Sequence, residues 1–202
     1  MIIQRPWWQS RIKLLMQHRP IVWLTGVRRV GKTVLCQSLE NVQYFDCELP
    51  SVRREMEDPE LFLKAHDGML LALDEIHRLE DPALLLKIAA DHFPRIRVIA
   101  TGSSTLGASS KFRDTLAGRK SELYLTPLCE ADSNFPQYND RTRRFLNGGL
   151  PSFYLADLRD ERDYSEWMEA FWARDILELF RLERRNSFLK FAELIFAQSS
   201  GR

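Results

Sequence analysis

The segment from Gly26 to Thr33 reads GVRRVGKT and has the spacing GxxxxGK[ST]. Glycines let consecutive backbone N–H groups turn toward one anion, at φ values that other residues resist. A helix beginning at Gly31 would add its dipole and its N-terminal amides. Lys32 would reach the outer phosphates, and the Thr33 hydroxyl would bind Mg²⁺. The segment therefore predicts a loop that binds the phosphates of a nucleotide.

All residues of this loop and the residue after it are predicted to contact the nucleotide: Gly26, Val27, Arg28, Arg29, Val30, Gly31, Lys32, Thr33 and Val34. Arg28 and Arg29 bring extra positive charge near the phosphates, although solvent-facing positions are also open to both. The motif follows an apolar stretch and precedes a helical one, which is the context that the mechanism needs. This context argues against a chance match.

An apolar run over residues 69–73 ends in Asp74 and Glu75. At a strand tip beside the phosphate loop, Asp74 would hold Mg²⁺ through water, so Thr33 and Asp74 are the predicted metal ligands. Glu75 would polarise the attacking water as a general base. The alternative is an amphipathic helix with ordinary surface acids, but the run 70–73 is continuous rather than 3.6-periodic. The pair predicts a hydrolase, and the absence of an N/TKxD guanine motif and of an LSGGQ-like signature favours ATP hydrolysis by a non-transporter enzyme.

Short apolar runs alternate with helical stretches over the first two thirds of the chain. Strands are expected at 21–25, 43–47, 69–73, 96–101 and 122–126, and helices at 32–40, 61–64, 82–92 and 105–116. Continuously apolar strands indicate burial on both faces, as in a parallel sheet between helices. The expected fold is therefore an α/β layered domain.

After Pro127 the strand-like runs stop. Residues 132–144 are polar and predict a linker or short helix, and helical patterns follow at 163–184 and 186–198. We therefore expect an ATP-binding domain over residues 1–130 and a helical lid, with the start of a C-terminal region, over 131–202.

Composition narrows the class of protein. The 202 residues are 45% hydrophobic with a formal net charge of +1, which excludes a mainly disordered chain and a wholly polyanion-binding surface. Three scattered cysteines offer neither a disulfide framework nor a zinc motif, and the apolar runs are too short for a membrane span. A cytoplasmic protein that does not enter the membrane is expected.

Five landmarks in order resemble the AAA-type ATPases, specifically a prokaryotic group of predicted ATPases: GVRRVGKT (26–33), LDEIH (73–77), ATGSS (100–104), LAGR (116–119) and GGLP (148–151). The resemblance implies a five-stranded parallel sheet in the order 5-1-4-3-2. It implies that Ser103 or Ser104 senses the γ-phosphate or the attacking water, although the same residues suit a turn and helix cap. It also implies that Arg119 is an arginine finger for a neighbouring subunit and that Pro151 packs on adenine. The alternatives are a salt bridge on a loop for Arg119 and a generic turn between domains for residues 148–151.

The predicted function is binding and hydrolysis of ATP with Mg²⁺, coupled to conformational change in a partner or a DNA-associated assembly. A nucleotide-dependent switch with little turnover, and a DNA-associated module that uses the loop for assembly, stay open as alternatives. ATP or ADP, a second copy of the chain, and a protein or DNA partner bound through the C-terminal region are the expected partners. Relatives usually continue further, so the chain is either a fragment or a shortened member. For His77, a surface or capping role is favoured over nucleotide sensing.

Overall fold

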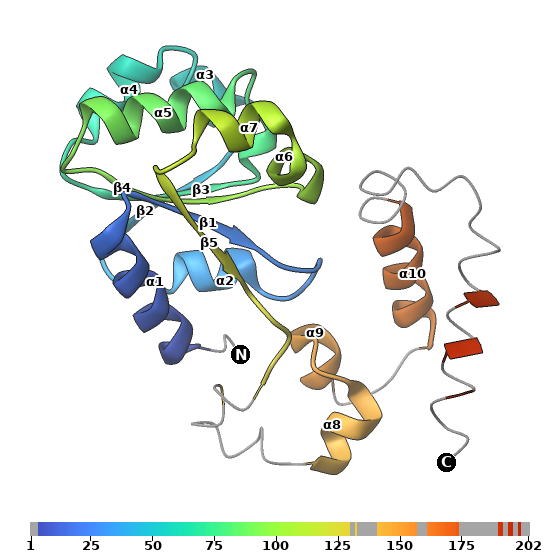
Figure 1. Ribbon diagram of the computed structural model, residues 1–202. Coiled ribbons are helices and arrows are strands. Elements are labelled where there is room, and N and C mark those ends of the chain that lie inside the picture. The colour runs from blue at the N-terminus through green and yellow to red at the C-terminus, as the bar shows by residue number, and fades with distance from the viewer. Residues whose placement is uncertain are drawn as a thin grey trace. The chain divides into compact units, whose positions relative to one another are not determined.

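The computed structural model describes residues 4–129, 132, 141–156, 161–173, 190–191, 194–195 and 198 (Figure 1). The chain forms two compact units, Met1–Arg159 and Asp160–Arg202. The expected domain boundary at residues 130/131 therefore stays a prediction, because the helical segment that follows the sheet groups with the first unit.

Five parallel strands form one sheet in the order β2-β3-β4-β1-β5, which confirms the order predicted from the resemblance. The strands are β1 Ile21–Thr25, β2 Val42–Asp46, β3 Leu70–Asp74, β4 Arg97–Thr101 and β5 Lys120–Tyr124. All five runs expected from the sequence are strands, with ends shifted by at most two residues at each side. Because all strands are parallel, their carboxyl ends meet at one edge of the sheet.

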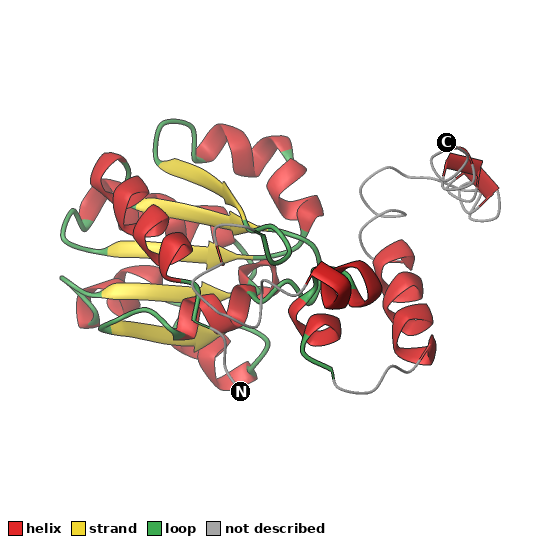
Figure 2. Cartoon of the chain, turned by 90° about the horizontal axis from the view of Figure 1, so that it is seen from below, coloured by secondary structure: helices red, strands yellow, loops and turns green. Residues whose placement is uncertain are grey.

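Helices cover both faces of the sheet, as Figures 1 and 2 show. On one face lie α1 Pro6–His18 and α2 Lys32–Gln37. On the other lie α3 Pro50–Glu55, α4 Pro59–Ala65, the 3₁₀ turn Ile76–Arg78, α5 Pro82–His92, α6 Ser104–Ala108 and α7 Ser110–Thr115. The structure is thus the three-layer α/β domain that the alternating pattern predicts.

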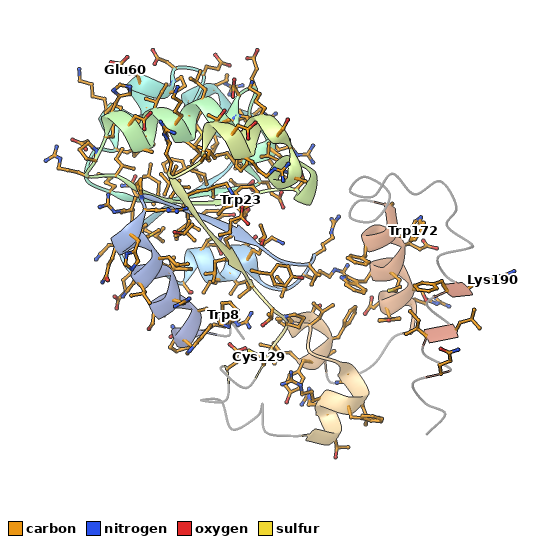
Figure 3. All side chains as sticks on the ribbon, viewed as in Figure 1. Trp8, Trp23, Glu60, Cys129, Trp172 and Lys190 are labelled. Atoms are coloured by element: carbon orange, nitrogen blue, oxygen red, sulfur yellow. The ribbon has the colours of Figure 1, made fainter. Side chains whose placement is uncertain are left out.

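Alternate strand residues build two cores. Those on the α5 face, including Trp23, Leu71 and Leu73, pack with Phe62 of α4 and Phe112 of α7. Trp23, labelled in Figure 3, belongs to this core, with its ring centroid 4.8 Å from that of Phe112. The opposite strand residues, such as Val22 and Ala72, are equally buried beneath α1 and α2. Burial on both faces explains why β1, β3 and β4 are continuously apolar.

Two helices of the layers that cover the sheet were not expected from the sequence. Helix α1 begins with Pro6 and buries Trp8, Ile12 and Met16, which are spaced four residues apart and so share one face. Helix α3 has no buried residue, so it offers no apolar periodicity. The predicted helix 105–116 is two helices, because Ser109 adopts an extended conformation and caps α7 through the N–H of Phe112. Asp81 caps α5, since its side chain accepts from the N–H of Leu84.

Two short helices follow the sheet within the first unit, α8 Arg141–Asn147 and α9 Pro151–Tyr154. In the second unit α10 spans Glu161–Phe171, where Trp167 and Phe171 stack with centroids 5.3 Å apart. The rest of the predicted helix 163–184, most of 186–198 and most of the predicted linker lie outside the described residues. No helix among those the structure describes is both long and apolar enough to cross a membrane.

Candidate functional site

The segment 26–33 leaves β1 at the carboxyl edge of the sheet and enters α2, so a strand and a helix hold its two ends. Gly26 (φ 145°) and Gly31 (φ 98°) have backbone angles that side chains resist. A Cβ on Gly26 would lie 2.5 Å from the carbonyl oxygen of Leu125, so only glycine fits there. The loop conformation therefore follows from the glycine spacing of the motif.

The basic residues of the loop differ in direction: Lys32 crosses the loop, whereas Arg28 and Arg29 face solvent. The Lys32 ammonium donates to the carbonyls of Gly26 (2.8 Å) and Val27 (3.3 Å), so it spans the loop that encloses the predicted phosphates. Arg28 and Arg29 are exposed, with Arg29 at φ 64°. Their solvent-facing alternative is the one observed, and contact of either with a nucleotide stays a prediction.

The carboxylate of Asp74 is the centre of the site. It is 3% exposed and accepts hydrogen bonds from three hydroxyls. Thr33 Oγ1 of α2 and the Tyr44 hydroxyl of β2 donate to Oδ2 at 2.7 and 2.8 Å, and Thr101 Oγ1 of β4 donates to Oδ1. The sheet order produces this arrangement, because β3 lies between β2 and β4 and α2 packs over β2 and β3. The phosphate loop and the acidic strand thus meet, as the motifs predict.

Tyr44 and Thr101 were not singled out in the sequence. Burial, and then the hydrogen bond to Asp74, raise the pKa of the Tyr44 phenol, which keeps it protonated as a donor. Thr101 also accepts from the N–H of Glu75 at 3.0 Å, so one hydroxyl fixes both acidic residues. A polar residue that ends an otherwise apolar strand is the signal that could have pointed to Thr101.

Glu75 follows Asp74 in a left-handed conformation, φ 52° and ψ 43°. This region costs a non-glycine residue of the order of 1–3 kcal/mol and is concentrated at functional sites. Its Oε2 lies 3.1 Å from Nδ1 of His77. The hydrogen bond from His77 lowers the pKa of Glu75 and outweighs the opposing effect of burial, with Lys32 and Arg78 adding to the lowering. The carboxyl group is therefore ionised at neutral pH. His77, for which a surface or capping role was expected, is partly exposed, and its ring contacts Glu75.

The donors around Asp74 fit Mg²⁺, a hard cation that prefers oxygen and is bound in such sites by one or two protein groups plus phosphate oxygens. Thr33 Oγ1 and Asp74 Oδ2 are the two oxygens that the loop and the strand bring together. Over the part of the chain described, no group of three or more His, Cys, Asp or Glu could hold a metal alone. A cation held by Thr33 and Asp74 would therefore need further oxygens, such as those of a phosphate.

The predicted sensor residues lie beyond the end of β4. Ser103 is the N-cap of α6, where its hydroxyl accepts from the N–H of Leu106 at 3.3 Å, and Ser104 is the first residue of that helix. Nothing is described of the Ser104 side chain. Gly102 lies between Thr101 and Ser103, where a Cβ would come 2.8 Å from the Trp23 ring. The turn and cap function is thus observed for Ser103, and its sensor role stays a prediction.

Arg119 lies at the amino ends of the strands, opposite the edge of the sheet that carries the phosphate loop. It precedes β5, whose first residue, Lys120, pairs with Ile21 at the start of β1, so a strand of about 16 Å separates it from the loop that follows β1. Its guanidinium binds both carboxylate oxygens of Asp91, at 2.7 and 2.9 Å. Arg119 therefore cannot reach the loop of its own chain, and action on a neighbouring subunit stays a prediction.

The GGLP segment lies against the site. The N–H of Leu128 donates to the carbonyl of Gly149 at 2.7 Å, which ties the segment to the exit of β5. A Cβ on Gly31 would lie 3.9 Å from Cγ of Pro151, so the proline is next to the phosphate loop. Packing of Pro151 on adenine is not tested by this geometry. Val34, in α2, is 37% exposed and open to a ligand.

A buried ion pair near the loop was not expected. Arg5 binds Asp132 through two hydrogen bonds of 2.8 and 2.7 Å, and both side chains are almost inaccessible. Arg5 also donates to the carbonyls of Val30 in the loop (3.4 Å) and Thr126 after β5 (3.1 Å). One guanidinium thus joins the entry to α1, the phosphate loop and the exit of the sheet.

Comparisons with known proteins agree with this fold. The family model described as AAA domain matches residues 18–132. Two curated relatives, uncharacterized proteins of Mycobacterium tuberculosis and Mycobacterium bovis, are each 29% identical over 187 residues, or 89% of this chain. The chain spans 41% of the length of these relatives.

Solved structures share the fold. The Walker-type ATPase of Pyrococcus abyssi has a TM-score of 0.55 at 18% identity, over 92% of this chain and 77% of that one. A signal transduction ATPase with numerous domains and a tetratricopeptide repeat sensor, from Pyrococcus horikoshii, has a TM-score of 0.50 at 11% identity, over 80% of this chain and 32% of that one. At such identities the likeness is one of fold alone. Since the family model covers more than half of the chain, from before β1 to beyond β5, the chain belongs to the AAA domain family of P-loop ATPases.

Proposed function

We propose that the chain binds ATP with Mg²⁺ and hydrolyses the bond between its β- and γ-phosphates. The observation that carries the proposal is the 2.7 Å hydrogen bond between Thr33 of the loop and Asp74 of β3, with Glu75 next in the chain. It joins the phosphate-binding element to the acidic one at the carboxyl edge of the sheet, where α/β proteins bind ligands.

Each residue then has a distinct part. The backbone N–H groups at the start of α2 and the Lys32 ammonium bind the phosphates, and the ammonium neutralises negative charge there. Thr33 and Asp74 would hold Mg²⁺, which when bound neutralises charge on the β- and γ-phosphates. These groups position the γ-phosphate, and such positioning supplies most of the catalysis in phosphoryl transfer.

Glu75 is the proposed general base. Its ionised carboxylate accepts a proton from a water molecule as the water oxygen bonds to the γ-phosphorus. The bond from that phosphorus to the bridging oxygen breaks, and its electron pair leaves with ADP. The proton then passes to solvent, which returns Glu75 to its starting state.

ATP is the proposed nucleotide because the sequence lacks a guanine-reading N/TKxD motif. Pro151, next to Gly31 of the loop, is the proposed packing surface for the flat adenine ring, which an apolar ring contacts without competing hydrogen bonds. The contact also links α9 to the phosphate loop. Nucleotide exchange would therefore move the GGLP segment. We propose that this movement acts on a protein or DNA partner.

A homo-oligomer is proposed to complete the site. Arg119, at the far edge of the sheet, would act on the γ-phosphate held by a neighbouring copy, where a guanidinium neutralises developing charge. Ser103 or Ser104 would sense the same phosphate from within the chain. Mixing Arg119→Ala with Glu75→Gln should partly restore turnover, and no restoration in a proven oligomer would contradict the role of Arg119.

Free cysteines suit a reducing compartment. Cys36 and Cys47 are buried thiols, and burial raises the pKa of Cys47 to about 12, which makes it inert. This supports, as a proposal, the cytoplasmic location expected from the sequence.

The test compares ATP turnover by the wild type with that of Glu75→Gln. Loss of a general base lowers kcat by about 10²–10⁴-fold, while the dissociation constant for ATP should stay within about twofold. Glu80→Gln is the matched control, because Glu80 is an exposed acid five residues further along. Equal turnover by wild type and Glu75→Gln would refute hydrolysis through Glu75. Tight binding with negligible turnover by the wild type would support the switch instead.

A further inference from the structure

His77 connects the general base to the loop that follows β4. It lies on the 3₁₀ turn Ile76–Arg78, immediately after Glu75. Its Nδ1 lies 3.1 Å from Oε2 of Glu75 and 3.3 Å from the backbone nitrogen of Ser103. A single ring nitrogen is therefore within hydrogen-bond distance of two groups, one just after β3 and one just after β4.

The two contacts have opposite requirements. A carboxylate only accepts, so the bond to Glu75 needs a hydrogen on Nδ1. A backbone N–H only donates, so the bond from Ser103 needs a bare Nδ1. Because one nitrogen cannot be a donor and an acceptor at once, the two bonds belong to different tautomers of the ring and exclude each other.

The residues around His77 place both partners next to its ring. Thr101 binds the N–H of Glu75, which fixes the backbone of Glu75 while leaving its carboxylate to His77. Gly102 has no side chain, and a Cβ there would lie 3.6 Å from both the backbone nitrogen and Nδ1 of His77. The loop therefore approaches the ring closely. The His77 side chain is 26% accessible, so it is neither a core group nor a fully solvated one.

We propose that His77 is a positioning residue for Glu75: with a hydrogen on Nδ1 the ring holds the carboxylate, and with a bare Nδ1 it releases the carboxylate and binds the backbone of Ser103. The conformation of residues 101–103, which lead into the predicted sensor residues Ser103 and Ser104, would thus set the direction of the base. This inference rests on the proposed function, since it concerns the same carboxylate.

Three substitutions separate this role from a structural one. In Asn, a side-chain amide nitrogen takes the place of Nδ1, whereas in Gln it takes the place of Nε2, one bond further out. We expect His77→Ala and His77→Gln to lower kcat for ATP hydrolysis by about 10–100-fold, as misplacement of a catalytic group does. His77→Asn should stay within about threefold of the wild type, and the dissociation constant for ATP within about twofold throughout.

The mechanism also predicts non-additivity. In a Glu75→Gln background, His77→Ala should cost nothing further, because the group that it positions is already gone. A loss of the same size in that background would overturn the inference, as would full activity of His77→Ala. In either case the proposed function would still stand if ATP hydrolysis by the wild type depends on Glu75.

A measurement without turnover makes the two failures distinguishable. The chain has four histidines, so the ¹⁵N signals of His77 can be assigned by their loss in His77→Asn. We expect Glu75→Ala to shift the Nδ1 signal toward that of a bare nitrogen and to move the amide signal of Ser103. Unchanged signals would overturn the inference even if Glu75 proved irrelevant to hydrolysis.

Discussion

Replacing Arg5 by Met should destabilise the protein strongly, because it leaves a buried carboxylate without its partner. The side chains of Arg5 and Asp132 are 4% and 1% exposed, and two hydrogen bonds join them. Breaking such a pair costs about 3–5 kcal/mol. For a chain of this size each kcal/mol lowers Tm by about 2–4 °C, so we expect a decrease of about 6–20 °C.

Thermal unfolding followed by circular dichroism measures this effect, with Lys13→Met as the matched control. Lys13 and Glu40 also form an ion pair, of 3.1 Å, but their side chains are 62% and 82% exposed. An exposed pair of this kind contributes less than about 1 kcal/mol. If Arg5→Met lowers Tm no more than Lys13→Met does, the reasoning from burial is wrong.

The same pair predicts a pH dependence. Burial raises the pKa of Asp132, but the hydrogen bonds from Arg5 and from the N–H of Cys129 outweigh it, so the pKa is lowered overall. The unfolded chain therefore binds a proton at a higher pH than the folded one, and the stability is present at neutral pH and lost on acidification. The difference in unfolding free energy between wild type and Asp132→Asn should shrink from pH 7 to pH 3. A constant difference would contradict the lowered pKa.

Two further changes test the loop and its support. Lys32→Ala should weaken nucleotide binding at least tenfold, about 1.4 kcal/mol, since its ammonium spans the loop, and an unchanged dissociation constant in calorimetry would refute the phosphate role. Gly102→Ala should lower Tm and alter tryptophan fluorescence, because the new Cβ would come 2.8 Å from the buried Trp23 ring; unchanged Tm and fluorescence would contradict the packing argument.

Features that are local in the sequence could be predicted from it. The loop 26–33 and the pair Asp74–Glu75 were found because their chemistry is written in consecutive residues. Strands β1, β3 and β4 were found because each is an apolar run buried on both faces, whereas the outer strands β2 and β5 are only partly buried and were found from their shorter apolar runs. The strand order was available only from the family resemblance, since periodicity does not say which strands are neighbours.

Features that depend on that order could not be predicted. Tyr44 and Thr101 act on Asp74 only because β2 and β4 flank β3, and both are separated from Asp74 by more than 25 residues. Arg5 and Asp132 are 127 residues apart, and neither belongs to a motif. Helix α1 was missed although its buried residues share one face, because apolar residues such as Trp7 and Leu14 also lie on its exposed side and obscure the periodicity.

The hydroxyls around Asp74 explain how the site is organised for a ligand. Each hydroxyl has one hydrogen and two lone pairs, and those of Thr33 and Thr101 give their hydrogens to Asp74. The lone pairs of Thr33 are therefore left for a cation, while a lone pair of Thr101 receives the N–H of Glu75. A carboxylate that only accepts thus sets the direction of the hydroxyls beside it. Asparagine at position 74 would put a donor in its place, so the hydroxyls facing that nitrogen would have to reverse.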